Sequence, residues 1–252
     1  MLESYALILC RIGGLVLAAP VLGSRVVPFR FRLALVVVLS LVVAPIAGVQ
    51  TPESDHELIE WMFLEAMVGT LMGLGLRILV AGFAMSGHVI GQMTGIKLDG
   101  STPQQDEEVG SVMGRLYNWI AIIGFIVIGG PSRLVRQLLN SYIDIPIGSF
   151  AFDFHAGNQL LLDITQTSFQ LAIQVGMPVF VCLFCATIVV GLISRSVPQV
   201  NMMNFGLIAN SMILVVSISL SMGAAMWMFQ NHCSDLIDSK DWRSVINLNV
   251  PN

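Results

Sequence analysis

The apolar residues of this chain gather in six long runs separated by short polar stretches. A helix needs about 20 mostly apolar residues to cross the roughly 30 Å hydrocarbon core of a bilayer. The runs predict helices over Tyr5–Leu22, Leu33–Val49, Leu58–Ile96, Leu116–Gly130, Leu160–Ile193 and Met203–Phe229. The third and fifth are too long for a simple crossing, which points to helices that are tilted, broken or partly outside the bilayer. Positions where they could bend are Pro178, Gly69, Gly73 and Gly75.

The composition supports a membrane protein over a soluble one. Of the 252 residues, 55% are hydrophobic and 11% are charged, whereas a soluble domain has about 25% charged residues. The net charge of −4 is weak and spread out, so it offers no basic face for nucleic acid. We therefore predict an all-α fold, a polytopic membrane protein of about six long, partly broken apolar helices, with the lipid bilayer as a partner.

The first two connections carry opposite charge. The stretch Ser24–Arg32 holds three arginines and no acid, whereas Gln50–Glu60 holds four acids and no Lys or Arg. Because cytoplasmic loops are enriched in basic residues, the first connection is predicted to be cytoplasmic and the second external. The hypothesis that follows places the N-terminus outside.

Motifs of known enzyme chemistry are missing from the sequence. It contains no H-E-x-x-H, no G-x-S-x-G and no Walker-type phosphate loop, and its four histidines have no metal-ligand spacing. Cys182 and Cys185 are spaced C-x-x-C but lie in an apolar run, which favours packing over metal or redox chemistry. We expect no enzymatic activity and no catalytic, cofactor-binding or metal-binding residues.

Five ionisable residues lie in or at the edge of apolar runs. A charge at mid-bilayer costs on the order of 3 kcal/mol, so it usually faces protein, water or an opposite charge. Pairing between helices or snorkelling to the headgroups is one interpretation, and an ion or proton path is the other. Glu65 and Arg77 are about 18 Å apart along a helix, so their partners must lie elsewhere. The five are Arg11, Glu65, Arg77, His88 and Asp163.

A glycine stripe precedes the most polar segment of the chain. Gly87, Gly91 and Gly95 recur every fourth residue, a double G-x-x-x-G that predicts close helix packing or a conformationally soft segment. His88 and Gln92 lie near the stripe and could hydrogen-bond across it. The polar residues from Lys97 to Glu108 follow directly. They form either a solvated loop or a loop lodged in a polar pore or subunit junction, where irregular backbone is tolerated at membrane depth.

Short motifs follow one another in a fixed order along the chain. They are Arg11 in the opening helix, Ala19-Pro20 followed by Arg25-Val-Val-Pro28, Ala44-Pro45, Gly91-Gln92-Met93-Thr94-Gly95 with its polar segment, Pro146-Ile-Gly148, and Arg195-Ser-Val-Pro198-Gln199-Val-Asn201. Together they resemble the FliR family of flagellar export-gate proteins and its type III secretion counterpart, SctT. The chain departs from that pattern in a more acidic central loop and in Gly129-Gly130-Pro131, where relatives often carry Gly-His. The resemblance implies a single FliR-like membrane domain over residues 1–252.

The resemblance also implies a function. Members of this family join FliP-like and FliQ-like membrane subunits, with FlhB-like and FlhA-like export components expected nearby. The assembly is the pore through which unfolded substrates leave the cytoplasm, in the bacterial inner membrane at the flagellar basal body. The family's central loop contributes to the plug that closes this pore. By analogy, the candidate gate segment comprises Gly91, Gln92, Met93, Gly95, Lys97, Asp99, Gly100, Asp106, Glu107 and Glu108.

Two alternatives stand beside the flagellar export gate. One is the equivalent SctT subunit of a virulence type III secretion system, which shares the same motifs. The other is an ion-coupled secondary transporter, in which Glu65, Arg77, His88 and Asp163 would couple ions to transport. Only the transporter requires that neutralising one of these residues abolishes transport and leaves assembly intact.

Overall fold

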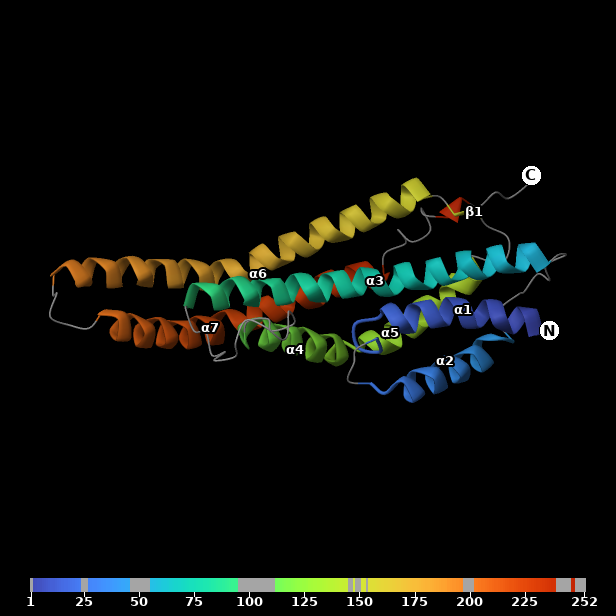
Figure 1. Ribbon diagram of the computed structural model, residues 1–252, viewed down its shortest axis with the longest axis horizontal. Coiled ribbons are helices and arrows are strands. Elements are labelled where there is room, and N and C mark those ends of the chain that lie inside the picture. The colour runs from blue at the N-terminus through green and yellow to red at the C-terminus, as the bar shows by residue number, and fades with distance from the viewer. Residues whose placement is uncertain are drawn as a thin grey trace, which may run out of the picture. The chain divides into compact units, whose positions relative to one another are not determined.

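Seven helices and one short strand pair make up the described part of the chain (Figure 1). The computed structural model describes residues 2–23, 27–45, 55–94, 112–144, 147, 151–152, 154–196, 202–238 and 246–247. The helices are α1 (Leu2–Ala18), α2 (Phe29–Val43), α3 (Asp55–Thr94), α4 (Val112–Val127), α5 (Gly130–Asp144), α6 (Phe154–Ser196) and α7 (Met202–Asp238). The strands β1 (Ala151–Phe152) and β2 (Ile246–Asn247) pair antiparallel. The predicted all-α class is confirmed.

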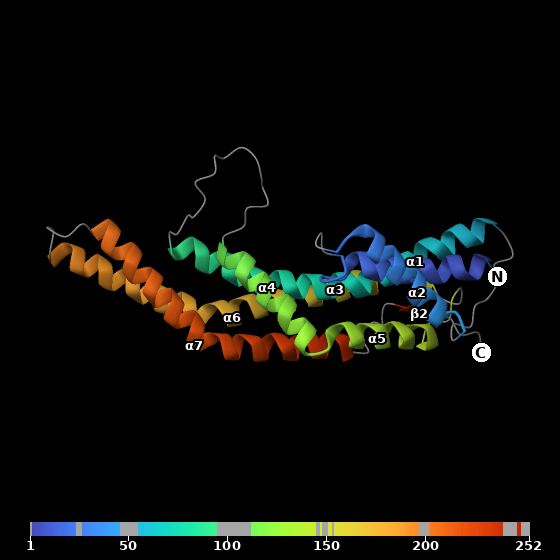
Figure 2. The ribbon, with the colours of Figure 1, turned by 90° about the horizontal axis from the view of Figure 1, so that it is seen from below.

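Within the described ranges, three helices are long and apolar enough to cross a membrane. They are His56–Thr94 in α3, His155–Arg195 in α6 and Ile208–Ile237 in α7, and α4 with α5 would make a fourth, broken span. The helix assignment runs without interruption through Gly69 and Gly73 in α3 and through Pro178 in α6. A bend of 63° separates α4 from α5 (Figure 2).

Helix α5 is missing from the six predicted helices. Its sequence is amphipathic rather than apolar throughout, so a search for long apolar runs passes over it. Leu134, Leu138 and Tyr142 recur every fourth residue and are buried, whereas Arg136 and Asn140 are exposed. The true signal for α5 was therefore a helical period in a segment of low mean hydropathy.

Gly129 separates α4 from α5 because it takes a left-handed backbone conformation, with φ +72°. Its N–H donates to the Ile126 carbonyl at 2.9 Å and closes the end of α4. Its own carbonyl accepts from the Ser132 hydroxyl at 2.7 Å and from the Arg133 N–H at 3.1 Å at the start of α5. Pro131 suits the first turn of α5, where a missing N–H costs no helical bond. The chain thus changes direction at a single residue.

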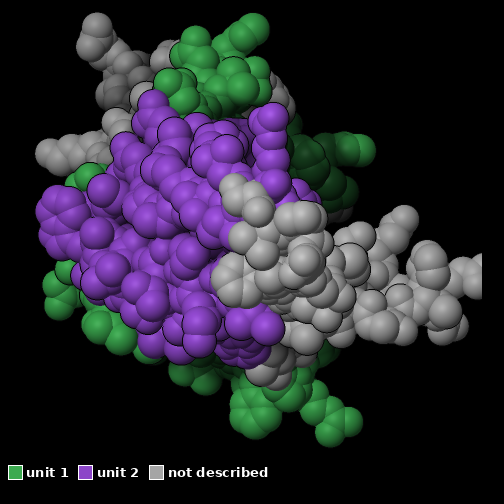
Figure 3. Space-filling view, turned by 90° about the vertical axis from the view of Figure 1, so that its left-hand side faces the viewer, with its two compact units in different colours: residues 1–79, 125–166, 233–252 green, residues 80–124, 167–232 purple. Residues whose placement is uncertain are grey.

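The chain divides into two compact units, which Figure 3 shows in separate colours. Unit 1 comprises residues 1–79, 125–166 and 233–252, and unit 2 comprises residues 80–124 and 167–232. Unit 1 has a core where α1, α3 and α5 meet, with Leu7, Ile12, Leu15, Met72 and Leu138 among its buried side chains. A smaller apolar cluster in the same unit joins Leu71 of α3 to Leu160 and Ile164 of α6.

Unit 2 is centred on aromatic side chains from three helices. The ring of Phe83 in α3 lies 5.5 Å from Tyr117 of α4 and 5.1 Å from Phe229 of α7, measured between ring centroids. All three are buried. Gly82 lies against the Ser168 backbone, so α3 and α6 approach closely in this unit. These contacts hold the last three turns of α3, where the candidate gate segment begins.

Candidate functional site

Helices α1 and α3 approach each other through glycines. A Cβ on Gly14 would lie 2.5 Å from the Ala66 carbonyl oxygen, and one on Gly69 would overlap the Arg11 carbonyl oxygen. Gly73 lies against Ala18 in the same way. Small residues on both helices let the two backbones nearly touch. Gly69 and Gly73, expected as places to bend, here provide close packing.

The close approach places Arg11 of α1 opposite Glu65 of α3. Both side chains are buried, with 0% and 1% of their surface exposed. The Arg11 guanidinium donates through Nη2 to Glu65 Oε1 at 3.0 Å and through Nε to the other carboxylate oxygen. This two-bond arrangement is the strongest form of an arginine–carboxylate pair. Glu65 therefore has its partner on another helix, as its separation from Arg77 indicated.

Helix α5 completes the surroundings of Arg11. Nη1 of Arg11 donates to the Ser141 carbonyl at 3.2 Å, and Cζ lies 4.4 Å from the centre of the Tyr142 ring. The Tyr142 hydroxyl in turn donates to the Ile8 carbonyl at 3.3 Å. The guanidinium is thus held by a carboxylate, a carbonyl and an aromatic face. We call Arg11, Glu65, Ser141 and Tyr142 the buried cluster.

The buried cluster joins three helices and is built to hold charge in place. Both carboxylate oxygens of Glu65 accept hydrogen bonds from Arg11, so each side chain has a partner of opposite charge within the core. Such a pair costs desolvation, so its main effect is to fix which helix faces meet. Sequence analysis identified Arg11 and Glu65 but missed Ser141 and Tyr142, because both lie on the unpredicted helix α5.

The other intramembrane charges do not join this cluster. Arg77 on α3 and Asp163 on α6 are exposed. His88 is half-buried, and its ring lies where a Cβ on Gly114 of α4 would be. Among the described residues, no group of three or more His, Cys, Asp or Glu could hold a metal ion.

The glycine stripe packs against α4 where the structure describes it. A Cβ on Gly87 would lie 2.6 Å from the Met113 carbonyl oxygen and 2.8 Å from the Tyr117 side chain. Gly91 is buried and Gln92 is exposed. At the end of α3 the buried Thr94 hydroxyl donates to the Gly91 carbonyl at 2.9 Å. Close packing thus accounts for Gly87, and the last turn of α3 carries the first residues of the candidate gate segment.

Many of the predicted gate and turn residues lie outside the described residues. Met93 is half-buried in α3, Pro28 precedes α2 and is exposed, and Arg195 is exposed near the end of α6. The residues outside are Gly95, Lys97, Asp99, Gly100, Asp106, Glu107 and Glu108 of the gate segment, and Arg25, Pro146, Gly148, Pro198, Gln199 and Asn201 of the turns.

Comparison with known proteins identifies the class of this apolar, helical chain. The profile of the bacterial export proteins, family 1, matches residues 2–236, and the chain belongs to this family. It is 25% identical to the flagellar biosynthetic protein FliR of Aquifex aeolicus, over 89% of this chain and 87% of the relative. It is 24% identical to FliR of Escherichia coli, over 93% and 88%. It also matches the secretion system apparatus protein SsaT of Salmonella typhimurium, at 24% identity over 64% and 62%.

These matches establish the FliR-type resemblance and, with the apolar helices, an integral membrane protein of a bacterial protein-export apparatus. The matched range covers α1 to α6 and nearly all of α7. It therefore includes the buried cluster of unit 1 and the aromatic cluster of unit 2.

Proposed function

We propose that this chain is the FliR-type subunit of a flagellar type III export gate in the bacterial inner membrane. The family match over residues 2–236 carries the proposal, because it runs through both units without a break. Five further relatives carry the name FliR, in addition to the two described above, and one relative is SsaT. These names favour the flagellar over the virulence system. On this view residues 1–252 act as one domain.

The proposed partners are FliP-like and FliQ-like subunits, which would form the pore together with this chain, and FlhB-like and FlhA-like components beside it. Helices α6 and α7 each contain an apolar segment of 18 residues of which only 22% is buried within the chain. The corresponding segment of α3 is 61% buried. The exposed apolar surface of α6 and α7 supports an assembly. Helices α6 and α7 thus leave most of their apolar surface for lipid or for other subunits.

The proposed role of Gly91–Glu108 is to contribute to the plug of the pore. Support comes from its start in the last turn of α3, a helix that is tightly packed through Gly87, and from a polar composition that suits a wet lumen. A plug needs a fixed base, and the aromatic contacts of Phe83 with Tyr117 and Phe229 provide one. An export gate of this kind needs no chemistry of its own.

The buried cluster argues against the ion-coupled transporter. A coupling carboxylate must exchange its ion with water, whereas Glu65 is 1% exposed and both of its oxygens accept from Arg11. Among the other three candidate coupling residues, Arg77 and Asp163 are exposed, in contrast to Glu65. The geometry favours a structural role for Glu65 and leaves the export gate as the preferred function.

The test is purification of the full tagged chain from solubilised membranes with its chromosomal partners expressed, followed by mass determination of the intact complex. We expect one copy of this chain with several copies of two other small polytopic proteins. A lone monomer or homodimer would contradict the proposal. For the plug, deletion of residues 99–106 should raise ion leakage through the assembled complex in vesicles. The control is deletion of residues 248–252, which follow β2 and whose loss should leave leakage unchanged.

A further inference from the structure

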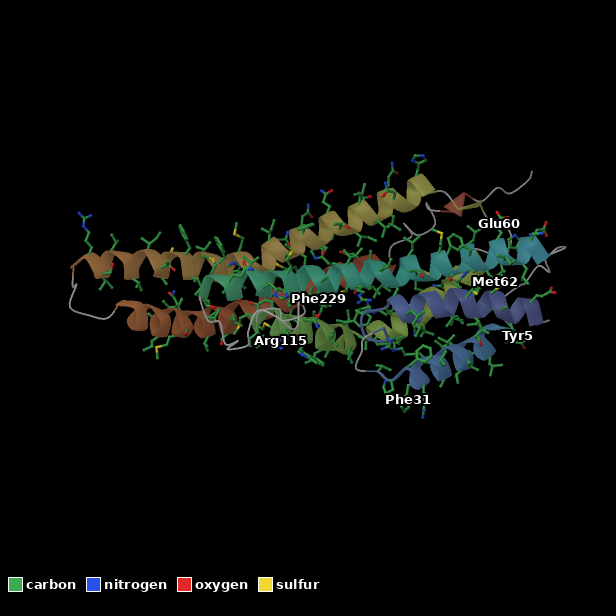
Figure 4. The ribbon with its side chains drawn as sticks, viewed as in Figure 1. Tyr5, Phe31, Glu60, Met62, Arg115 and Phe229 are labelled. Atoms are coloured by element: carbon green, nitrogen blue, oxygen red, sulfur yellow. The ribbon has the colours of Figure 1, made fainter. Side chains whose placement is uncertain are left out.

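Helix α2 has an unusually wide exposed apolar surface. Only Ser40 and Val43 of its 15 residues are buried. At about 100° per residue, its exposed positions fall in one broad arc. The large apolar residues of this arc are Phe29, Phe31, Leu33, Val37, Val38, Leu41 and Val42, each 48–69% exposed. In Figure 4 Phe31 marks this helix, which lies beside α1 in unit 1.

All the charge of α2 lies in its first turn and has one sign. Arg30 and Arg32 are in the first turn, and the helix contains no acid and no other base. Arg30 is exposed between Phe29 and Phe31, which are 62% and 69% exposed. Arg32 Nε donates to the Val27 carbonyl at 3.1 Å, which fixes its guanidinium at this end of the helix. The result is a cationic, aromatic rim on an otherwise apolar surface.

The length of α2 fits insertion into a membrane from one side. Fifteen residues make a helix of about 22 Å, shorter than the roughly 30 Å hydrocarbon core. Arginine side chains reach the headgroup region while their stems stay in apolar surroundings. When the two arginines lie at the membrane–water interface, the apolar remainder of α2 lies within the hydrocarbon. The other end of α2 carries no charged residue that would resist this insertion.

We propose that α2 binds an anionic phospholipid, with the phosphate at Arg30 and Arg32 and the acyl chains along Phe29 and Phe31. Charge complementarity selects this occupant: a guanidinium pairs with phosphate through two parallel hydrogen bonds, and basic residues next to a membrane-inserted segment attract anionic lipid. The partner thus presents a phosphate and an apolar chain side by side, as a phospholipid does. This lipid site is independent of the export function.

The first test is native mass spectrometry of the full chain, titrated in detergent with phosphatidylglycerol or phosphatidylcholine of the same acyl chains. Each basic side chain at an anionic surface is worth about fivefold in affinity. R30Q, which alters an exposed side chain, should therefore weaken phosphatidylglycerol binding about fivefold, and R30Q/R32Q about 25-fold. Phosphatidylcholine binding should change much less.

The control is R115Q/R136Q, which removes the same charge from exposed arginines of α4 and α5. Arg115 is labelled in Figure 4. This variant should keep the wild-type preference for phosphatidylglycerol. F29S/F31S should weaken the binding of both lipids to a similar extent. The proposal is overturned if R30Q and R30Q/R32Q bind phosphatidylglycerol like the wild type, or if the control loses as much affinity as R30Q/R32Q.

The second test asks what covers α2 in the cell. Position 31 is replaced by the photoreactive p-benzoylphenylalanine, cells are irradiated, and the mass of the purified adduct is determined. A phospholipid adduct at position 31 supports the site. An adduct to another protein, with none to lipid, would show that a partner subunit covers this face and would overturn the proposal.

Discussion

At the residue scale, the Arg11–Glu65 pair decides how α1 meets α3. Two opposite charges can be buried together in an apolar core. Either charge alone would destabilise the fold, because an unpaired buried charge loses its solvation without compensation. The pair also sits beside Gly69, whose missing side chain leaves room for the Arg11 backbone. Charge and shape therefore specify the same register of the two helices.

Breaking this pair should cost far more than removing it. We expect Glu65→Gln to destabilise the chain by about 3–5 kcal/mol, because Arg11 stays buried without its carboxylate. The double variant R11M/E65L should recover most of that loss. Arg77→Gln, an exposed position on the same helix, should stay within about 0.5 kcal/mol of the wild type. Thermal unfolding midpoints of the full chain in detergent measure all three. Equal losses in E65Q and R11M/E65L would refute the role of the pair.

Two adjacent glycines of α1 offer a matched test of the close approach. A Cβ on Gly14 would meet the Ala66 carbonyl oxygen at 2.5 Å, whereas one on Gly13 meets nothing within 4 Å. Gly14→Ala should therefore cost about 1–3 kcal/mol through overpacking. Gly13→Ala should gain up to about 1 kcal/mol from helix propensity. The same thermal midpoints report both, and equal shifts in the two variants would show that α1 and α3 do not touch at Gly14.

At the element scale, a search for long apolar runs predicts the long apolar helices but passes over α5. Apolar runs alone predicted α3, α6 and α7, although α7 extends past the predicted Phe229 to Asp238. Helix α5 has too few apolar residues for that criterion, and with it Ser141 and Tyr142 of the buried cluster escaped notice. Arg11 and Glu65 stood out because a charge in an apolar run is rare. Their mutual pairing depends on a tertiary contact that spacing along the chain does not reveal.

The junction between α4 and α5 rests on the left-handed backbone of Gly129. A side chain in this conformation costs about 1–2 kcal/mol for most residues, and less for asparagine. Gly129→Val should therefore lower stability more than Gly129→Asn. Gly223→Val, in α7 with nothing within 4 Å of a Cβ, controls for the bulk of the new side chain. Thermal midpoints in detergent provide the comparison, and an Asn variant as unstable as the Val variant would contradict the argument.

At the scale of the whole molecule, α6 has more exposed apolar length than a bilayer can cover. Exposed large apolar residues recur along a span of 32 positions in α6, from Leu162 to Ile193. Membrane helices tilt by at most about 40°, at which a 30 Å core covers about 26 residues of helix. A straight α6 would therefore carry at least one end of this stretch beyond the hydrocarbon, and we expect another protein subunit to cover the apolar residues there.

Different positions along α6 should therefore have different neighbours. With p-benzoylphenylalanine at Leu162 or at Leu192, irradiation of cells should cross-link at least one of the two ends to another protein subunit. The exposed and polar position His155 of α6 serves as the control for adventitious cross-linking. Adduct masses identify the neighbour in each case. If both ends gave only phospholipid adducts, α6 would lie wholly within lipid and its apolar length would not indicate an assembly. A protein adduct at one end would instead mean that the length of α6 is set by the partners it packs against.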